Sequence, residues 1–159
     1  MKKKNKAIYL LFLMPFVYFA TACFVVWLVK TSGIYPSGSD TMYHVYRGDY
    51  VYNAIKSGNW YPLYDPAWYN GVEILRYWSP FPAYVMAFCQ YLAGGSQFGA
   101  YLFYIGGVWF LGACVWPFIG RGFNRPYLGA FIGLLWFFMP NNLCAIFIEG
   151  NLARSLSMI

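Results

Sequence analysis

Three long stretches without Asp, Glu, Lys or Arg dominate the hydrophobic pattern of this chain. They run from Ile8 to Val29, from Phe98 to Ile119 and from Tyr127 to Ile148. Since a helix rises about 1.5 Å per residue, each stretch reaches about 33 Å and can cross a hydrocarbon core of about 30 Å. The pattern predicts an all-α integral membrane protein with three transmembrane helices. A cleaved signal peptide fits the first stretch less well, because the stretch is too long and no small-residue cleavage site follows it.

A fourth apolar stretch, Pro80 to Ala93, is short for a membrane span and contains two prolines and Gln90. If it does not cross, the second full span delivers Arg121 and Arg125 to the cytoplasm. Cytoplasmic loops carry an excess of Lys and Arg, so this arrangement is favoured. We expect Pro80 to Ala93 to form a helix that lies along or dips into the outer interface.

The other segments divide between the two sides of the membrane. A basic tail, residues 1–7, and a short turn, residues 120–126, are expected in the cytoplasm, whereas residues 30–79 and 149–159 are expected outside. The last segment resembles the start of another helix and stops without a polar cap. We therefore expect the chain to be the front part of something longer.

The long outer loop is predicted to contain a helix from about Asp40 to Lys56. Ser39 or Asp40 can cap its first turn, and Gly58 follows its end. The chain then becomes aromatic and rich in turn residues up to Pro82. Irregular backbone cannot face lipid, so this part must sit above the membrane or line a protein-walled cavity.

The composition agrees with a membrane protein and excludes other classes. Hydrophobic residues make up 60% of the chain and charged residues 10%, against about 25% charged in ordinary globular proteins. The net charge of +6 comes mainly from the basic tail and the turn with Arg121 and Arg125. Basic cytoplasmic edges beside anionic lipid account for it, so no nucleic-acid partner is expected. The four cysteines show no paired metal-ligand spacing.

The strongest candidate for chemistry is a trio in the predicted loop helix. Asp40, His44 and Arg47 fall at i, i+4 and i+7, which places them on one helix face. A carboxylate beside an imidazole can act as an oriented base or as two ligands of a divalent metal, and an arginine can hold a phosphate. The alternative stays open: Asp40 would be a helix cap, His44 an interfacial polar residue and Arg47 a headgroup contact.

Further candidates for substrate binding lie elsewhere outside the membrane. They are Trp60 and Trp68 as stacking faces for sugar rings, Arg76 for a lipid phosphate, and Glu149 and Arg154 beyond the third span. The aromatic residues equally suit an interfacial belt. Asp65 and Glu73 could meet a sugar or a metal, or be solvated loop acids. No motif of the chain indicates a nucleotide cofactor.

Several short motifs, taken in order, resemble a known group of membrane proteins. These motifs are Gly38 to Arg47, Ile55 to Pro62, Tyr69 to Gly71, Tyr77 to Pro82 and Glu149 to Arg154. The run resembles bacterial and archaeal polytopic proteins labelled "6-pyruvoyl-tetrahydropterin synthase-related". These proteins look like relatives of the GT-C glycosyltransferases, which use lipid-phosphate sugar donors.

The resemblance implies a function for the trio. Asp40 takes the place of the acid that serves GT-C enzymes as catalytic base or metal-linked residue, with His44 beside it. Arg47 and Arg76 are then candidates for the donor phosphate, and Mg or Mn is a cofactor that the resemblance allows. The implied reaction moves a sugar from a polyprenyl phosphate to an acceptor hydroxyl at the outer membrane face.

Family members have many more spans than this chain, so the isolated chain is expected to be inactive. Its expected partners are membrane lipid, a lipid-linked sugar, and the remaining part of the enzyme or another membrane subunit. The rival function is a non-catalytic membrane protein that supports assembly or glycan handling, or an inactive truncated remnant. A transporter fragment is less favoured, because the spans lack charged pathway residues.

The expected topology can be tested by thiol labelling. In a background without the four native cysteines, a cysteine at Asn59 should react with a membrane-impermeant reagent added to intact cells. A cysteine at Asn124 should stay protected until the cells are opened, because it lies in the cytoplasmic turn. Protection at Asn59 together with labelling at Asn124 would invert the topology.

Overall fold

The computed structural model describes residues 2–33 and 38–159, with side chains from Leu10 onward. Met1 of the predicted tail and residues 34–37 of the predicted loop lie outside the described residues. Within the described ranges the chain is helical and contains no β-strand, apart from one isolated bridge between Asp65 and Val72. The predicted all-α class is confirmed.

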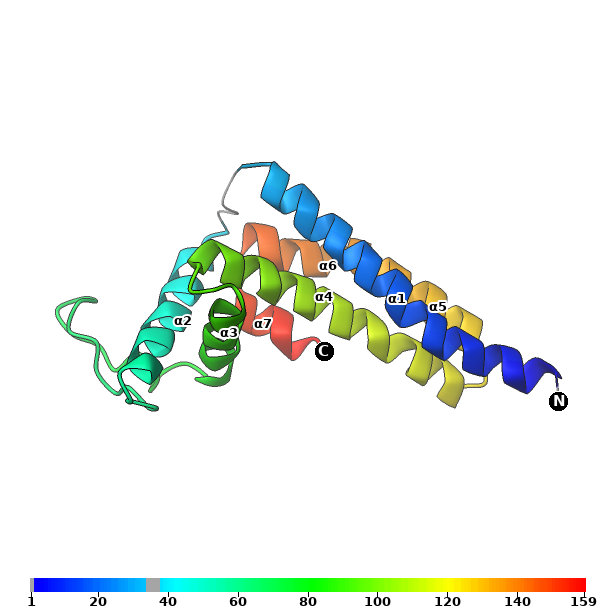
Figure 1. Cartoon of the computed structure of the whole chain (residues 1–159), viewed down its shortest axis with the longest axis horizontal. Helices are drawn as coiled ribbons and strands as arrows, with labels where there is room; N and C mark the ends of the chain where they lie inside the picture. The colour runs from blue at the N-terminus through cyan, green and yellow to red at the C-terminus, as the bar shows by residue number, and fades with distance from the viewer. Residues whose placement is uncertain (1, 34–37) are drawn as a thin grey trace.

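Three helical segments are long and apolar enough to cross a membrane, as predicted. They are Leu10–Thr31, Gln97–Gly122 and Pro126–Ile148. The first belongs to α1 (Lys2–Thr31), which begins within the predicted tail, and the second is α4 (Gln97–Gly122). Figure 1 shows α1, α4 and α5 running side by side along the long axis of the molecule.

The third span is a chain of short helices instead of one continuous helix. It consists of α5 (Pro126–Leu135), the 3₁₀ turn η1 (Trp136–Phe138), α6 (Pro140–Leu143) and the π-helical segment η2 (Cys144–Ile148). Met139 is extended, with φ −60° and ψ 122°, directly before Pro140. The helix is therefore interrupted at Pro140. The Asn142 side chain donates a hydrogen bond of 2.9 Å to the Trp136 carbonyl and replaces a helical bond that the break removes.

Glycines let α4 and α5 pack with their backbones almost in contact. A Cβ atom built on Gly129 would lie 2.4 Å from the Trp116 carbonyl oxygen and 2.8 Å from the Gly120 Cα atom. Small residues of this kind are favoured where membrane helices meet. The first span packs on the same pair: the buried Tyr18 hydroxyl donates a hydrogen bond of 2.9 Å to the Ala130 carbonyl of α5.

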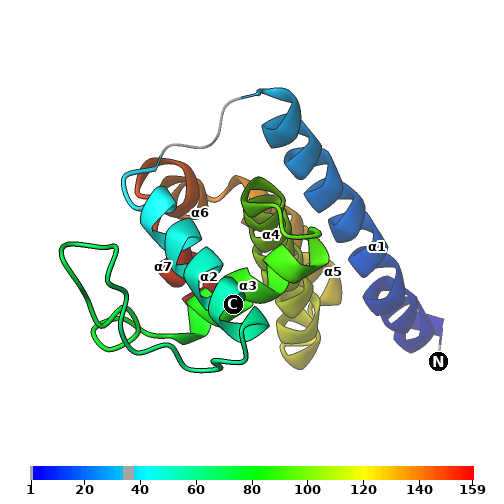
Figure 2. The ribbon, with the colours of Figure 1, turned by 60° about the vertical axis from the view of Figure 1, so that its left-hand side comes forward.

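Two shorter helices cover one end of the three long segments. They are α2 (Thr41–Lys56) and α3 (Phe81–Leu92), and they cross the beginning of α4 (Figure 2). With 12 residues, α3 reaches only about 18 Å and is not a candidate span. Gly48 of α2 lets α3 approach closely, because a Cβ there would meet the Met86 side chain at 2.2 Å.

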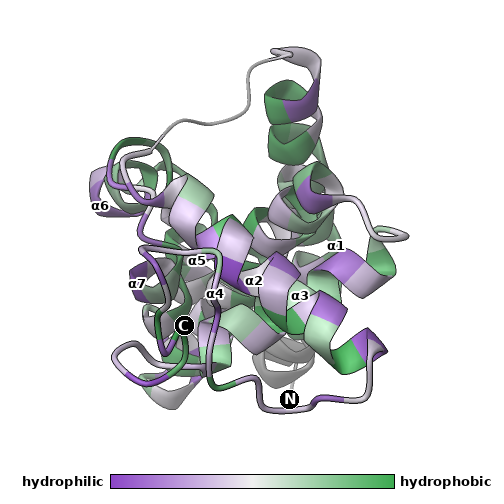
Figure 3. Cartoon of the chain, turned by 90° about the vertical axis from the view of Figure 1, so that its left-hand side faces the viewer, coloured by the Kyte–Doolittle hydropathy of each residue, from purple (hydrophilic) through white to green (hydrophobic). Residues whose placement is uncertain are grey.

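The two ends of the molecule are built from different segments. The N-terminus and the turn between α4 and α5 lie at one end in Figure 1, and α2, α3 and the loop that joins them lie at the other. Hydrophilic residues gather over α2 and its neighbours when this second end faces the viewer (Figure 3). Arg121, in the last turn of α4, thus lies on the side of the N-terminus. That this side faces the cytoplasm stays a prediction.

The contact between Gly120 and Gly129 predicts a position-specific stability effect. Gly129→Val should lower the free energy of unfolding by about 1–3 kcal/mol, because its side chain must push apart two backbones. Thermal unfolding and size-exclusion profiles in detergent would measure the loss. Gly122→Val is the matched control, since a Cβ there meets no atom within 4 Å. Equal stability of the two variants would contradict this packing.

Candidate functional site

The predicted trio lies on α2, with one residue exposed and two buried. Asp40 occupies the N-cap position directly before α2 and is exposed, while His44 and Arg47 are 5% and 1% exposed. The helix predicted from about Asp40 to Lys56 is present. The expected side-chain cap is absent, because the Asp40 carboxylate makes no capping hydrogen bond. Its oxygens thus remain available to solvent or to another group.

Hydrogen bonds to the end of the third span hold the residues directly before α2. The backbone N–H of Ser39 donates to the Ile148 carbonyl at 3.1 Å, and that of Asp40 donates to the Glu149 carbonyl at 2.9 Å. The Ser39 hydroxyl also donates to the Glu149 carbonyl, at 2.8 Å. Two polar segments far apart in the sequence thereby meet at one end of the molecule.

Glu149 and Arg154 form an ion pair within this meeting point. Arg154 Nη1 donates to both carboxylate oxygens of Glu149, at 2.8 and 2.7 Å, and Nη2 donates to Asn141 Oδ1 at 2.7 Å. Both charged side chains stay partly exposed, 37% and 43%. The structure therefore places these two predicted substrate-binding residues beside the start of α2, where Asp40 lies. Each of the two side chains is already paired with the other.

Arg47 is a buried cation that lacks an acidic partner. The two ion pairs in the described part of the chain are Arg76–Glu73 and Arg154–Glu149, and neither includes it. Its guanidinium lies 5.4 Å from the Tyr43 ring centre, and one nitrogen reaches the Trp78 carbonyl at 3.4 Å. The buried Nε atom has no hydrogen-bond partner. Burial lowers the pKa of Arg47, but an arginine stays charged at neutral pH.

His44 lies beside this cation and is uncharged at neutral pH. Burial is the main cause that lowers its pKa from 6.5 to about 4; the Arg47 charge lowers it further, and the Asp40 carboxylate acts in the opposite direction. A neutral imidazole can accept a hydrogen bond or bind a metal. It is also a weak base until negative charge comes close, because an anion next to it would raise its pKa.

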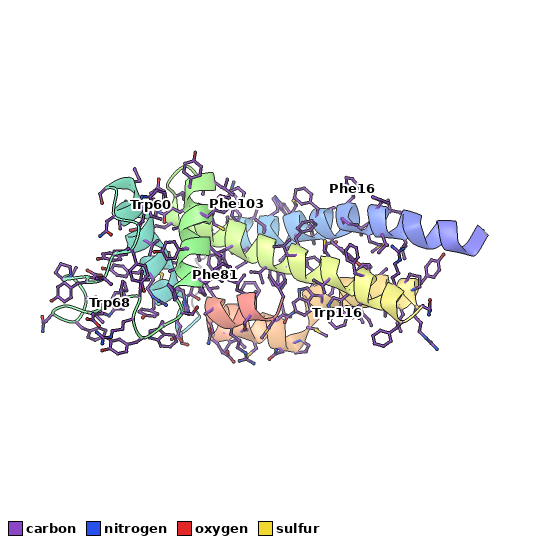
Figure 4. All side chains as sticks on the ribbon, turned by 90° about the horizontal axis from the view of Figure 1, so that it is seen from below. Phe16, Trp60, Trp68, Phe81, Phe103 and Trp116 are labelled. Carbon is purple, nitrogen blue, oxygen red and sulfur yellow. The ribbon has the colours of Figure 1, made fainter. Side chains whose placement is uncertain are left out.

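Aromatic residues of the loop cover the outer face of this part of α2. The Trp68 ring lies 5.1 Å from that of Tyr43 and 4.5 Å from that of Tyr46, while Trp78 lies 5.9 Å from Tyr43. Trp60 is 71% exposed and belongs to a different surface, where the Tyr84 hydroxyl donates to its carbonyl. Figure 4 shows Trp60 and Trp68 well apart at the α2 end of the molecule.

Asp65 holds the covering loop in place, which neither alternative from the sequence anticipated. The residue is 2% exposed, accepts hydrogen bonds from the Tyr46 hydroxyl at 2.5 Å and from the Ala67 N–H at 2.9 Å, and pairs its backbone with Val72. The bond to Asp65 raises the pKa of Tyr46 to about 12, so the phenol keeps its proton. Asp65 is thus structural, not a solvated acid or a sugar ligand.

The remaining predicted residues make local contacts. Arg76 pairs with Glu73 at 2.6 Å on the surface, with 66% and 40% of the side chains exposed. Asp49 accepts a hydrogen bond of 2.6 Å from Gln90 of α3. Arg76 as a phosphate ligand stays a prediction, and it would have to leave its carboxylate partner.

A metal site at Asp40 and His44 also stays a prediction. No group of three His, Cys, Asp or Glu residues suited to a metal ion occurs among the described residues. These two side chains would therefore need donors from water, substrate or another segment to complete a coordination sphere.

Sequence reasoning missed the groups that enclose Arg47. Tyr43 lies four residues before Arg47, the spacing that brings two helix side chains together, so its contact could have been anticipated. The Trp78 carbonyl could not, because the path of the loop between α2 and α3 is set by tertiary contacts such as the bond from Tyr46 to Asp65.

The lowered pKa of His44 predicts a pH-dependent stability. Between the unfolded value of 6.5 and the folded value of about 4, the unfolded chain binds a proton that the folded chain excludes. Stability should fall as the pH drops through this window, by about 2 kcal/mol from pH 7 to pH 5. Thermal unfolding of wild type and His44→Gln at several pH values would measure it. Parallel curves for the two proteins would rule out His44 as the cause.

Comparison with known proteins gives the family of the chain without a function. No curated protein and no solved structure matches it. A family model described as a 6-pyruvoyl-tetrahydropterin synthase related domain, a membrane protein, matches residues 75–159, just over half of the chain. The matched part includes Arg76, Glu149 and Arg154 and begins after the trio on α2. The chain therefore belongs to the 6-pyruvoyl-tetrahydropterin synthase related domain family of membrane proteins.

Proposed function

We propose that this chain takes part in a GT-C-like glycosyl transfer at the outer face of a membrane. A polyprenyl phosphate carries the sugar, and an acceptor hydroxyl receives it. The observation that carries the proposal is Arg47, a buried guanidinium with an unpaired Nε and no acidic partner in the described part of the chain. Leaving a buried cation unpaired costs several kcal/mol, so an anion that reaches it is strongly favoured.

In this proposal each residue of the trio has a separate role. The acceptor oxygen attacks the anomeric carbon of the sugar, and the bond from that carbon to the phosphate oxygen breaks. Asp40, whose carboxylate is exposed at the start of α2, removes the proton of the attacking hydroxyl. The bonding electron pair leaves with the polyprenyl phosphate, whose negative charge Arg47 stabilises.

His44 positions the phosphate in this scheme. The imidazole is neutral in the absence of ligand, and the charge of Arg47 is one reason. A phosphate between His44 and Arg47 would offset that charge, raise the pKa of His44 and turn the imidazole into a second hydrogen-bond donor. Binding of a phosphate and protonation of His44 would then reinforce each other.

A second candidate is a non-catalytic membrane protein, and one observation favours it. Arg47 is 1% exposed beneath Tyr43 and Trp78, so a phosphate reaches it only if the covering loop moves. In a scaffold the same arginine would stay enclosed and hold the loop through the Trp78 carbonyl and the Tyr43 ring.

Sugar transfer by the protein in its native membrane separates the two candidates. Asp40→Asn should reduce transfer by at least about a hundredfold, because general-base catalysis contributes about 10²–10⁴ in rate. Arg47→Met should abolish transfer while the protein remains folded, since the apolar side chain keeps the buried volume and the loss is limited to the long Trp78 carbonyl bond and the Tyr43 ring contact.

Glu73→Gln is the matched control, because Glu73 is a loop acid already paired on the surface with Arg76. Unchanged transfer in Asp40→Asn would remove Asp40 from the mechanism. Treatment with EDTA followed by Mg or Mn addresses the metal separately, and indifference to both would dismiss the ligand role of Asp40 and His44.

A further inference from the structure

An apolar groove runs between α1 and α4, away from the trio on α2. Its volume is about 630 Å³, within the range of about 300–1,000 Å³ that is typical of small-molecule pockets. Phenylalanines form much of its wall: Phe19 on α1, and Phe98, Phe103 and Phe110 on α4. Figure 4 shows Phe103 on the part of α4 that lies nearest α3.

Neighbouring glycines of α4 bring α1 close and also leave space beside it. A Cβ atom built on Gly106 would lie 2.9 Å from the Val26 side chain of α1, whereas one built on Gly107 meets no atom within 4 Å. The helices are therefore in contact on one side and separated on the other by missing side chains. A dry hollow of this kind facing hydrocarbon forfeits dispersion contacts unless an apolar chain fills it.

The length of the groove along the helices corresponds to one leaflet of a bilayer. On α1 the lining runs from Phe19 to Lys30 and on α4 from Ser96 to Phe110. At about 1.5 Å per residue this gives roughly 16–21 Å, close to half of a hydrocarbon core of about 30 Å. The groove thus has the length of a single acyl chain and is short for a long polyprenyl chain.

Positive charge marks the polar end of the groove. Lys30 lies in the last turn of α1, is exposed, and takes no part in the two ion pairs of the described chain. Ser96, the N-cap of α4, lines the same end, so the positive end of the dipole of this 26-residue helix points there. None of the described residues that line the groove is acidic.

We propose that this groove binds an anionic phospholipid. One acyl chain fills the space between the phenylalanines of α1 and α4, and the lipid phosphate lies at Lys30 and the start of α4. The occupant is an ordinary membrane lipid, so the proposal does not depend on glycosyl transfer. It holds whether or not Asp40 and Arg47 act on a sugar phosphate.

Native mass spectrometry of the purified chain, released from nanodiscs, tests the lipid preference. In discs with equal amounts of phosphatidylglycerol and phosphatidylcholine, the chain should retain phosphatidylglycerol preferentially. Lys30→Gln should reduce this preference about fivefold, the effect of one lysine near an anionic surface, and Lys30→Arg should keep it. Lys30 is exposed, so both variants leave the packing intact.

A second pair of variants tests the hollow itself. Gly107→Leu should fill the groove without a backbone clash and lower retention of both lipids. Gly122→Leu, also with free space at its Cβ but outside the groove, should leave retention unchanged.

Equal retention of the two lipids by the wild type would overturn the proposal, as would undiminished binding in Gly107→Leu. Displacement of phosphatidylglycerol by an equimolar polyprenyl phosphate would overturn the assignment to a phospholipid and give the groove to the sugar carrier.

Discussion

A backbone carbonyl inside the hydrocarbon core of a bilayer needs a hydrogen-bond donor from the protein, and the break in the third span leaves carbonyls without their helical donors. After Met139 and Pro140 interrupt the helix, Asn142 supplies one of the lost hydrogen bonds. The carbonyls of Ile148 and Glu149 at the far end of the span receive theirs from Ser39 and Asp40. These bonds fix the start of α2 across the bundle, and with it the direction in which His44 and Arg47 enter the interior.

With α2 in this direction, His44 and Arg47 are enclosed, while the acidic residues bond to other groups. Asp49, Asp65, Glu73 and Glu149 each accept a hydrogen bond from a side chain other than that of Arg47. Asp40 is the acid that interacts electrostatically with His44. The buried Arg47 charge thus lies beside a neutral imidazole, and such a pair attracts an anion. A folded chain would gain stability by neutralising it.

Much of this fold could be predicted from uncharged runs and charge placement, because lipid imposes a length and the absence of charge on every span. The three candidate spans and the helix after Asp40 were predictable for this reason. The roles of Asp65 and Asp49 were not, since both depend on partners, Tyr46 and Gln90, whose positions follow from tertiary packing. The burial of Arg47 could not be predicted either, because helical spacing places the residue on a helix face but does not say what covers that face. The catalytic and metal roles of the trio stay predictions.

The contact between Gly38 and Gly150 has a mechanical consequence. A Cβ on either glycine would lie within 2.6 Å of the other segment, and Thr41 fills the remaining space. The start of α2 and the end of the third span therefore cannot slide past each other, and they must move as one unit. Any tilt of the last turns of that span in the bilayer would displace Asp40 by a similar amount.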